Sequence, residues 1–469
     1  MQISQIFVFR NDLRYQDNTA LNAALKQAAL TNTYVLPIFI VNPLQIDKNS
    51  NQYASDSCIQ FMVDSLQDLH NNLSSKEGKL YLFHGETILT LETLLSLPEC
   101  KGVQGIWVNS DYTPYARTRD SNILKLCNSR NIKFSAYEDR LLHALGSIKP
   151  NTGSKVYLKF SPFFSKASQI PVREVSELDD KFYKCLYTGL LNSSFLITDL
   201  AVLSKYYKFS NNCPRGGRTE ALKIIDDLPN FVNYEDIRDF PSKNTTQLSA
   251  HNKFGTLSIR ELYWHIYYTL GVDSVLIKQL YWRDFYYNII WVTNDMSLST
   301  KSKYDSTVWH NDLTLFDKWK TGQTGFPLID AGMRQLNETG CMPNRVRMAV
   351  ADFLVKLLMI DWRWGEKYFA QKLHDYDPAI NNGNWQWVAG SGADAQPYFR
   401  VFNPWTQSEK FDADCVYIKK WCPELSNVPS YAIHSWFNYH SKFKTTYPTP
   451  IIDYEKSRQN GIKLYKDTV

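Results

Sequence analysis

Residues 343–387, PNRVRMAVADFLVKLLMIDWRWGEKYFAQKLHDYDPAINNGNWQW, are the stretch around which the rest of the chain is organised. The first part, residues 344–360, is apolar on most helical faces, which predicts a buried helix. Pro343 suits the start of this helix, because the N–H of a first-turn residue has no partner inside a helix. By helical spacing, Asn344, Met348 and Ala351 share one face.

The polar residues of the same stretch indicate a binding site. Arg347 lies within the predicted helix and needs a partner, since an unpaired interior charge is very costly. Asp375 or Asp377 could supply the carboxylate. Residues 377–387, DPAINNGNWQW, read as a polar turn, and a polar turn between apolar helices must satisfy its backbone groups. A bound cofactor is one way to do so, and an ordinary loop after a buried helix is the alternative.

Length and composition narrow the class of protein. A chain of 469 residues with ordinary hydrophobic content suggests two or three domains. The net charge of +5 is small, so a nucleic-acid partner would need a local basic face. The 8 cysteines form no CxxC pair and no His/Cys cluster at zinc spacing, so we expect no metal and reduced, intracellular thiols. The sequence shows neither the apolar core of a signal peptide nor an apolar run long enough to span a membrane.

Residues 1–140 alternate short β-branched or aromatic runs with helical patterns. The expected strands are residues 6–9, 34–41, 80–83, 106–108 and 134–137, and the expected helices are residues 18–29, 58–73, 86–97 and 115–128. This order predicts an α/β domain with a Rossmann-like, doubly wound parallel sheet. The first strand is followed by FRNDLRYQDN rather than GxGxxG, so a dinucleotide-binding unit is not indicated.

The remainder of the chain divides into two further segments. Residues 141–205 are less regular and read as an interdomain linker, and residues 206–469 have the pattern of an all-α domain. Within that domain TTQLS, residues 245–249, lies just before a predicted helix. Helix N-termini offer free N–H groups and a positive dipole end, which suits a phosphate. An ordinary Ser/Thr N-cap is the alternative interpretation.

Four runs, in sequence order, closely resemble the flavin-binding region of the cryptochrome/photolyase family: IDWRWGEKYFAQKL, DYDPAINNGNWQW, GADAQPYFRVFNPWTQSEKFD and YIKKWCPEL. The resemblance covers nearly the whole chain and is strongest from about Trp282 to Leu425. It is nearest to the class I cyclobutane pyrimidine dimer photolyases. FRNDLR is similar to the opening of the family's antenna-binding domain.

The resemblance implies which residues hold FAD. TTQLS matches the family's pyrophosphate-binding run, Asn381 stands where the family has an asparagine facing flavin N5, and Asp375 with Arg347 matches an ion pair beside the isoalloxazine. The implied FAD-binding residues are Tyr234, Thr245, Thr246, Gln247, Leu248, Ser249, Arg283, Arg347, Asp375, Asp377 and Asn381.

A second implied set binds damaged DNA. A pyrimidine dimer must leave the base stack to react, and aromatic walls such as Trp282 and Trp387 replace the lost stacking. Arg238 and Arg345 would meet flanking phosphates. The implied substrate-binding residues are Arg238, Gln279, Trp282, Asn344, Arg345, Met348 and Trp387.

The resemblance also implies electron-transfer groups and an antenna. Trp385, Trp362 and Trp309 match the family's three-tryptophan electron relay, and with Asn381 they form the implied catalytic set. Thr113 stands where folate-type relatives place a glutamate. A deazaflavin or a second flavin is therefore favoured over a folate as antenna, with an empty antenna pocket as the alternative.

Two positions depart from the nearest relatives. Gln279 stands where class I dimer photolyases carry a glutamate that hydrogen-bonds the dimer bases, and glutamine at this place occurs in (6–4) photolyases and animal cryptochromes. Pro343 stands where many relatives have histidine, and the run CMPNRVRM lacks the paired histidines of a (6–4) enzyme. Gln279 therefore weakens the dimer assignment without supporting the (6–4) one.

The resemblance implies a deoxyribodipyrimidine photo-lyase activity, in which excited reduced FAD transfers an electron to a flipped-out cyclobutane dimer. The main alternative is a cryptochrome-type blue-light receptor, and a third is repair of another lesion such as the (6–4) photoproduct. The chain ends soon after the family core, at GIKLYKDTV, which favours repair over signalling. We expect a monomer that binds UV-damaged DNA and no membrane, cytoplasmic and nucleoid-associated if the source is prokaryotic.

Overall fold

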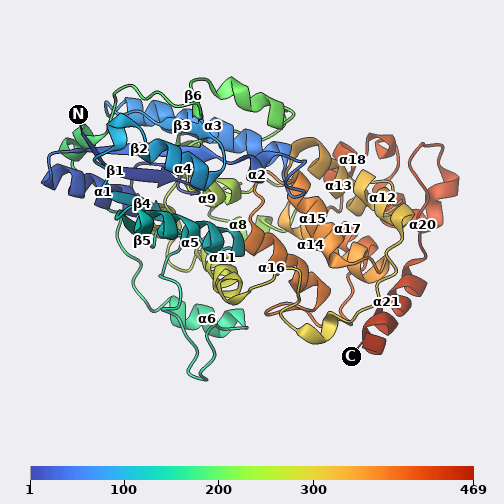
Figure 1. The fold of residues 1–469 in the computed structure, drawn as a ribbon. Helices are drawn as coiled ribbons and strands as arrows, with labels where there is room; N and C mark the ends of the chain where they lie inside the picture. The colour runs from blue at the N-terminus through green and yellow to red at the C-terminus, as the bar shows by residue number, and fades with distance from the viewer. Residues whose placement is uncertain (1, 469) are drawn as a thin grey trace. The chain divides into compact units, whose positions relative to one another are not determined.

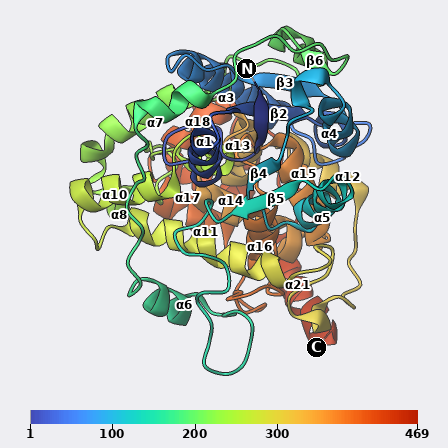
Figure 2. The same ribbon diagram turned by 60° about the vertical axis from the view of Figure 1, so that its left-hand side comes forward.

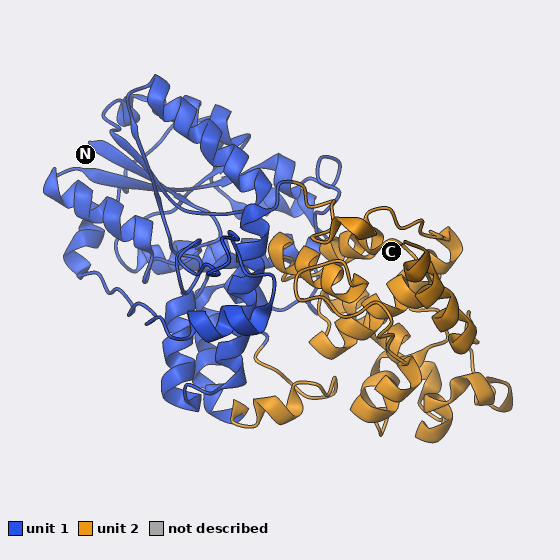
Figure 3. Cartoon of the chain, turned by 90° about the horizontal axis from the view of Figure 1, so that it is seen from below, with its two compact units in different colours: residues 1–230, 247–294 blue, residues 231–246, 295–469 orange. Residues whose placement is uncertain are grey.

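The computed structural model describes residues 2–468, which fall into two compact units (Figure 3). Of the described residues, unit 1 contains 2–230 and 247–294, and unit 2 contains 231–246 and 295–468. Residues 247–294 belong by sequence to the expected helical domain but pack within unit 1. The domain boundaries expected at residues 140 and 205 remain a prediction. No helix within residues 2–468 has the length and apolar character needed to cross a bilayer.

Unit 1 is built on a six-stranded sheet (Figure 1). Its strands are β1 (Ile3–Phe9), β2 (Tyr34–Val41), β3 (Tyr81–His84), β4 (Gly105–Asn109), β5 (Lys133–Tyr137) and β6 (Leu196–Ile197). The order is β5-β4-β1-β2-β3-β6, and the first five strands are parallel, which confirms the predicted α/β sheet. Strand β6 pairs antiparallel with β3 and comes from the segment read as linker. A two-residue edge strand is too short to leave a periodic pattern in the sequence.

Helices cover both faces of this sheet because its central strand is apolar on both sides. Phe7 and Phe9 of β1 pack in one cluster with α1 and α3, whereas Ile6 and Val8 pack in the other with α4 and α5. A parallel sheet covered on both faces has near-continuous apolar strands. The helices of unit 1 are α1 (Thr19–Leu30), α2 (Pro43–Ile46), α3 (Asp56–Ser74), α4 (Thr87–Leu95), α5 (Pro114–Ser129), α6 (Phe160–Ala167), α7 (Arg218–Asp226), α9 (Ser249–Phe254), α10 (Ile259–Leu270) and α11 (Val275–Val292).

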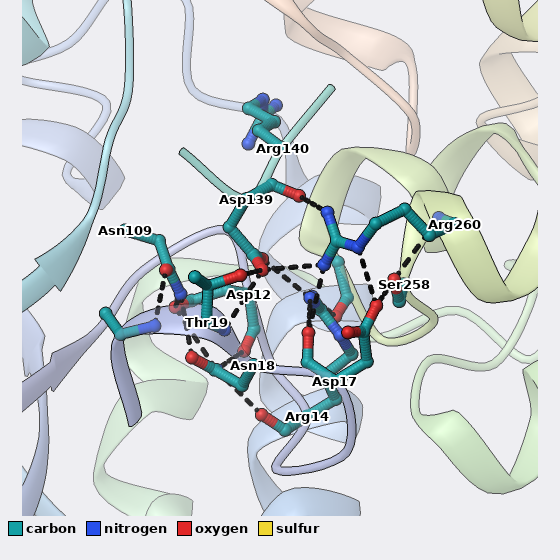
Figure 4. A network of polar contacts seen from close by, with 12 residues as sticks. Asp12, Arg14, Asp17, Asn18, Thr19, Asn109, Asp139, Arg140, Ser258 and Arg260 are labelled. Atoms are coloured by element: carbon teal, nitrogen blue, oxygen red, sulfur yellow. Dashed lines mark hydrogen bonds and ion pairs between the residues drawn. The ribbon is translucent and has the colours of Figure 1, made fainter. Parts of the chain in front are cut away.

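A buried network of charges joins α10 to the loops at the ends of β1 and β5 (Figure 4). Arg260 of α10 donates to Asp17 at 2.7 Å and to Asp139 at 2.8 Å, and Arg14 donates to Asp139 at 2.6 Å. All four side chains are almost fully buried. The network therefore attaches residues 247–294 to the α/β part of unit 1. Helices α10 and α11, which pack against each other, are labelled in Figure 2.

Unit 2 is helical, as predicted for the second half of the chain. Its helices are α8 (Tyr234–Ile237), α12 (Leu313–Thr321), α13 (Pro327–Thr339), α14 (Asn344–Asp352), α15 (Trp362–Lys372), α16 (Pro378–Ala389), α17 (Pro404–Phe411), α18 (Val416–Trp421), α19 (Ser430–His434), α20 (Trp436–Tyr439) and α21 (Tyr454–Thr468). The predicted buried helix at residues 344–360 is present as α14 followed by a π-helical turn, η6 (Phe353–Leu357). Its apolar side chains lie in a large hydrophobic core of this unit.

The prediction of a polar turn at residues 377–387 is wrong, because this segment forms helix α16. The Asp377 side chain caps the helix by accepting from the N–H groups of Ala379 and Ile380, at 3.0 and 3.4 Å. Pro378 occupies the first turn, where its missing N–H costs nothing. Polar side chains inside the helix are satisfied from outside it: Asn382, for example, donates to the carbonyl of Met296 at 2.9 Å. Such partners lie far away in sequence, so local polarity favoured a turn.

Candidate functional site

Helices α14, α15 and α16 carry most of the predicted site residues of unit 2, and α16 packs against both others. Asn381 is buried on α16, and its amide nitrogen donates to the Glu366 carbonyl at 3.0 Å and to the Glu366 carboxyl Oε1 at 3.1 Å. Both amide hydrogens are therefore directed at α15. The amide oxygen of Asn381 is the polar atom of this side chain that is left for a ligand. Such an oxygen can accept a hydrogen bond from a protonated ring nitrogen.

Glu366 is a site residue that the sequence analysis missed. Its side chain is buried, and burial raises its pKa from 4.5 to about 7, while the hydrogen bond from Asn381 opposes that rise. A carboxyl group with such a pKa exists in both charge states near neutral pH. The run WGEKYF by itself gives no signal for this, since a glutamate within a helix is usually exposed.

The partner of Arg347 is Asp375, one of the two candidates from the sequence. The Arg347 guanidinium donates to Asp375 at 3.0 Å and to the carbonyl of Met342 at 2.8 Å. Asp375 is nearly buried, whereas the Arg347 side chain is 28% exposed. Asp377 instead serves as the cap of α16. The ion pair therefore presents a positive group at the accessible side of α14.

The run 245–249 is divided between the two units, and each part is described separately. In unit 2, Thr246 is buried and Thr245 is partly buried. In unit 1, Gln247 has a left-handed backbone, with φ of 51°, and Leu248 precedes α9 without a side-chain cap. The first N–H groups of α9 are therefore not satisfied by a capping side chain. This matches what a phosphate requires, although α9 is short.

The substrate-side residues of unit 2 differ in how firmly they are held. Arg345 donates to Asp239 at 2.5 Å, and its guanidinium lies 4.3 Å from the centre of the Phe411 ring. Asn344 is exposed and its amide contacts the sulfur of Met348 at 3.6 Å. Asp239 was not predicted, and nothing in the sequence links it to Arg345.

Three further predicted residues of unit 2, on α8, at its C-terminal end and on α16, are partly exposed. Burial raises the pKa of the Tyr234 phenol, so this side chain is a neutral hydrogen-bond donor at ordinary pH. Trp387, like Tyr234 and Arg238, is partly exposed. These side chains are therefore accessible to a ligand.

Helix α11 of unit 1 carries Gln279, Trp282 and Arg283. Gln279 and Trp282 are partly exposed and lie one turn apart on the same helical face. Arg283 is buried and donates to the carbonyl of Arg140 at 2.8 Å and to Asp284 at 3.2 Å. Burial raises the pKa of Asp284 to about 7, although the Arg283 charge opposes this. Arg283 is thus anchored inside unit 1.

The three tryptophans of the predicted relay all lie in unit 2, and their exposure differs. Trp385 and Trp362 are 3% and 2% exposed, whereas Trp309 is partly exposed. The Trp385 ring lies edge-on to Phe369, with centroids 4.9 Å apart. It also lies against Gly365, where an added Cβ would be 2.2 Å from the indole. Glycine at this position is therefore required for the close approach of Trp385 to α15.

The predicted antenna position has a structural role of its own. The Thr113 side chain caps α5 by accepting from the N–H of Ala116 at 3.2 Å. Nearby in unit 1, Arg10 pairs with Asp120 of α5 at 2.8 Å. Within residues 2–468 no group of three or more His, Cys, Asp or Glu side chains could hold a metal ion.

Comparison with known proteins identifies both parts of the chain. Residues 5–179 match the family described as DNA photolyase, and residues 276–467 match the FAD binding domain of DNA photolyase. A protein of Buchnera aphidicola subsp. Baizongia pistaciae named deoxyribodipyrimidine photo-lyase is 35% identical, over 98% of this chain and 97% of its own length.

Two solved structures have the same fold. The crystal structure of an archaeal photolyase from Sulfolobus tokodaii, which contains two FAD molecules, has 39% identity and a TM-score of 0.86 over 99% of this chain and 100% of its own. A cryptochrome of Synechocystis sp. PCC6803 has 25% identity and a TM-score of 0.87, over 99% of each chain. The fold is therefore shared by repair enzymes and by a cryptochrome.

Proposed function

We propose that this chain, which belongs to the DNA photolyase family, is a deoxyribodipyrimidine photo-lyase that uses FAD and light to split cyclobutane pyrimidine dimers in DNA. The observation that carries the proposal is the polar set of α14–α16 inside the FAD-binding match. A buried asparagine with a free amide oxygen and an ion pair with an accessible guanidinium lie on packed helices there. A purely structural helical core would not need these groups.

The residues of unit 2 suit the isoalloxazine ring of FAD. Bound FAD would supply the excited-state electron that opens the dimer, which no side chain can provide. Asn381 would accept a hydrogen bond from a flavin nitrogen, and its position is fixed by the two bonds to Glu366. Arg347, held by Asp375, would place a positive charge beside the ring and favour a negatively charged flavin. Tyr234, Thr245 and Thr246 are the other unit 2 groups that we assign to the cofactor.

In unit 1 we assign Gln247, Leu248 and Ser249 to the FAD pyrophosphate, because the start of α9 has no side-chain cap. Arg283 would support the cofactor indirectly, since its guanidinium is bound to Asp284 and to the carbonyl of Arg140. Asp377 likewise acts through α16, whose first turn it caps.

The DNA-binding assignment rests on accessible aromatic and polar groups. A flipped dimer loses its base stacking, and Trp282 and Trp387, both partly exposed, would replace it. Asn344, Met348 and Gln279 would contact the bases, and Arg238 would meet a phosphate. Arg345 is bound to Asp239, so it would have to exchange this carboxylate for a phosphate when DNA binds.

The deciding experiment is illumination of the purified, flavin-loaded protein with two DNA substrates. One carries cyclobutane dimers and the other carries (6–4) photoproducts, and loss of each lesion is measured with pre-reduced flavin. We expect the cyclobutane dimers to disappear and the (6–4) photoproducts to remain. A protein that neither contains nor takes up FAD, or that repairs only (6–4) photoproducts, contradicts the proposal.

We assign Trp385, Trp362 and Trp309 to the delivery of electrons to FAD, because indole loses an electron readily and the three differ in exposure from buried to accessible. Trp385→Phe should nearly abolish light-driven reduction of oxidised FAD and should leave dimer repair by chemically reduced protein much less affected. Equal photoreduction in wild type and variant would mean that another donor is used.

A blue-light receptor is the second candidate function, and Gln279 is the observation that favours it. Repair that is absent at every pH in the wild type and present in Gln279→Glu would show that Gln279 marks a change of function and would favour the receptor. The antenna that we propose is a second flavin or a deazaflavin; the similar Sulfolobus tokodaii protein contains two FAD molecules. Folate recovered from the native protein would contradict this assignment.

The site of action that we propose is cellular DNA, with the protein as a monomer in the cytoplasm, associated with the nucleoid if the source is prokaryotic. One protein molecule is enough to bind a single lesion, so lesion binding does not require a second copy of the chain. Analytical ultracentrifugation with and without dimer-containing DNA tests this, and a stable dimer of the free protein would contradict it.

A further inference from the structure

Within unit 1, the ring of Phe160 stacks on Trp282, the side chain that we assign to stacking on the lesion. The rings of Phe160 and Trp282 are parallel, with centroids 3.6 Å apart and planes inclined by 6°. Phe160 is the first residue of α6, and Trp282 lies in the middle of α11. Contact at this distance covers one face of the indole. Since Trp282 is nevertheless partly exposed, its accessible part belongs to the opposite face or to the ring edge.

Phe160 is held firmly in this position. It is 3% exposed and lies edge-on to Phe285, with centroids 5.8 Å apart and planes at 85°. Phe163, on the same helix, also packs against Phe285 at 5.6 Å, so α6 is anchored to α11 by two rings. Trp282 meets Phe285 edge-on as well, at 5.7 Å and 90°. The indole is thus restrained on one face and along one edge, and the Tyr286 ring lies offset beside it, with centroids 5.9 Å apart and planes inclined by 29°.

We infer that Phe160 is a positioning residue for lesion binding, which backs Trp282 so that a flipped pyrimidine stacks on the opposite face of the indole. This inference rests on the proposed function and extends it to a residue outside the assigned site. An indole that is open on both faces can change rotamer, and fixing it before binding removes part of the entropy cost of ordering it in the complex. The flipped base would then complete a three-layer stack of Phe160, Trp282 and pyrimidine.

The same geometry fixes the orientation of the base. Gln279 lies one helical turn before Trp282 on the same face of α11. A base that stacks on the indole is therefore placed beside the amide of Gln279, whose hydrogen bonds are directional. If Trp282 could rotate, the distance from the stacked base to Gln279 would vary. Because Phe160 holds the indole in place, a base that stacks on Trp282 stays at the right distance for a hydrogen bond with Gln279.

A competing interpretation makes Phe160 a plug that occupies the place of the base in the free protein. Burial and anchoring through Phe163 argue against it, because a plug must leave when substrate binds. The two interpretations also predict opposite effects of removing the ring. Loss of a backing ring weakens lesion binding, and loss of a plug strengthens it.

The test compares Phe160→Leu with wild type as full-length, flavin-loaded proteins. Leucine keeps most of the buried volume and removes the flat ring. Phe164→Leu is the matched control, because Phe164 lies one turn along α6 and contacts Phe160 and Tyr281, at 5.7 and 5.3 Å. The Kd is measured for an oligonucleotide with one cyclobutane dimer and for the same oligonucleotide undamaged, and dimers repaired per absorbed photon are measured at saturation.

We expect Phe160→Leu to bind the dimer-containing oligonucleotide about three- to tenfold more weakly, the range that one aromatic pair contributes. Affinity for undamaged DNA, the flavin spectrum and repair at saturation should stay close to wild type. Phe164→Leu should bind the dimer like wild type.

Four results would overturn the inference: unchanged or tighter dimer binding by Phe160→Leu, equal loss for damaged and undamaged DNA, an equal loss in Phe164→Leu, or failure of Phe160→Leu to fold and retain FAD. The last would make Phe160 a core residue of unit 1 rather than a positioning residue. Failure of the proposed function itself is distinguishable, because wild type would then neither prefer nor repair the dimer.

Discussion

Two buried carboxyl groups, one in each unit, have pKa values shifted in opposite directions. Asp139 of unit 1 is 3% exposed and Glu366 of unit 2 is 4% exposed. Burial disfavours the ionised form of Asp139, but the charges of Arg14 and Arg260 outweigh it and lower the pKa below its ordinary value. Burial raises the pKa of Glu366 to about 7, and only the Asn381 amide opposes the rise. The difference lies in the neighbouring cations and not in the depth of burial.

This difference indicates a structural role for Asp139 and a pH-dependent charge for Glu366. Arg14 and Arg260 favour the ionised form of Asp139 and lower its pKa, and the network holds α10 against the sheet loops of unit 1 (Figure 4). Glu366 changes charge near neutral pH and is bonded to the asparagine that we assign to the flavin. Unit 2 therefore keeps a buried acid whose raised pKa no arginine offsets next to the proposed flavin site, whereas in unit 1 the Asp139 carboxylate is compensated by two arginines.

The largest effect is expected when the buried network of Arg14, Asp17, Asp139 and Arg260 loses one of its arginines. Arg260→Met leaves Asp17 and Asp139 buried with too little positive charge, and breaking a buried pair costs about 3–5 kcal/mol. Arg173→Met is the matched control, because Arg173 approaches the same Asp17 at 3.7 Å but its side chain is 47% exposed. The control should lose less than about 1 kcal/mol. The free energy of unfolding in urea measures both, and similar losses would refute the distinction.

The next effect concerns the uncompensated acid. Because the pKa of Glu366 is raised from 4.5 to about 7, the neutral form stabilises the fold fully below the unfolded pKa, and this stabilisation is lost as pH rises through about 7. Wild type should lose on the order of 2–3 kcal/mol from this group between about pH 5 and pH 8. Glu366→Gln should lack that slope.

The measurement is the free energy of unfolding against pH at constant flavin occupancy. Glu409→Gln, at an exposed position on α17, is the control for removal of a negative charge and should keep the wild-type slope. Parallel curves for wild type and Glu366→Gln would show that Glu366 is compensated in solution after all.

A third variant disturbs the same helix without changing a charge. The Cβ of Gly365→Ala would lie 2.2 and 2.4 Å from atoms of the Trp385 indole and 2.6 Å from Leu354. The indole must move, and overpacking of this kind costs about 1–3 kcal/mol. Flavin photoreduction should slow as well if Trp385 is the first donor. The loss of stability should be independent of pH; a loss that follows the titration of Glu366 would instead show that the variant acts through that carboxyl.

The smallest effect is expected from adding an uncompensated acid where the chain has an amide. Gln279→Glu changes one hydrogen bond in a partly exposed place, so the effect on dimer binding should be about 1–2 kcal/mol. Wild type should repair dimers with a flatter pH dependence than the variant, which should keep repair and show an additional pH-sensitive step. Repair yield against pH with pre-reduced flavin measures this, and Gln279→Asn controls for side-chain length. Identical flat profiles would mean that this position does not contact the dimer.

Local sequence patterns predicted helices and strands well where the buried residues recur with the period of a helix or a strand. The strands and helices expected in residues 1–140 are all present, since the inner strands of a parallel sheet are buried on both faces and are apolar. Residues 377–387 were misread because polar side chains usually mark exposed turns. In α16 they are buried and satisfied by residues 296–300, for example through Gln386, which accepts from the N–H of Thr300 at 2.8 Å.

The sequence by itself determined the alternation of strands and helices in residues 1–140, the helical second half, the family resemblance and the residue types that a flavin and a flipped base require. These features depend on local spacing and on side-chain chemistry. Tertiary structure decided which groups became partners. Arg347 pairs with Asp375 because Asp377 caps α16. The pKa of Glu366 lies near neutrality because burial raises it and no neighbouring cation among the described residues offsets that rise. Phe160 stacks on Trp282. Such pairings depend on distances across the fold, which the spacing of residues along a chain does not contain.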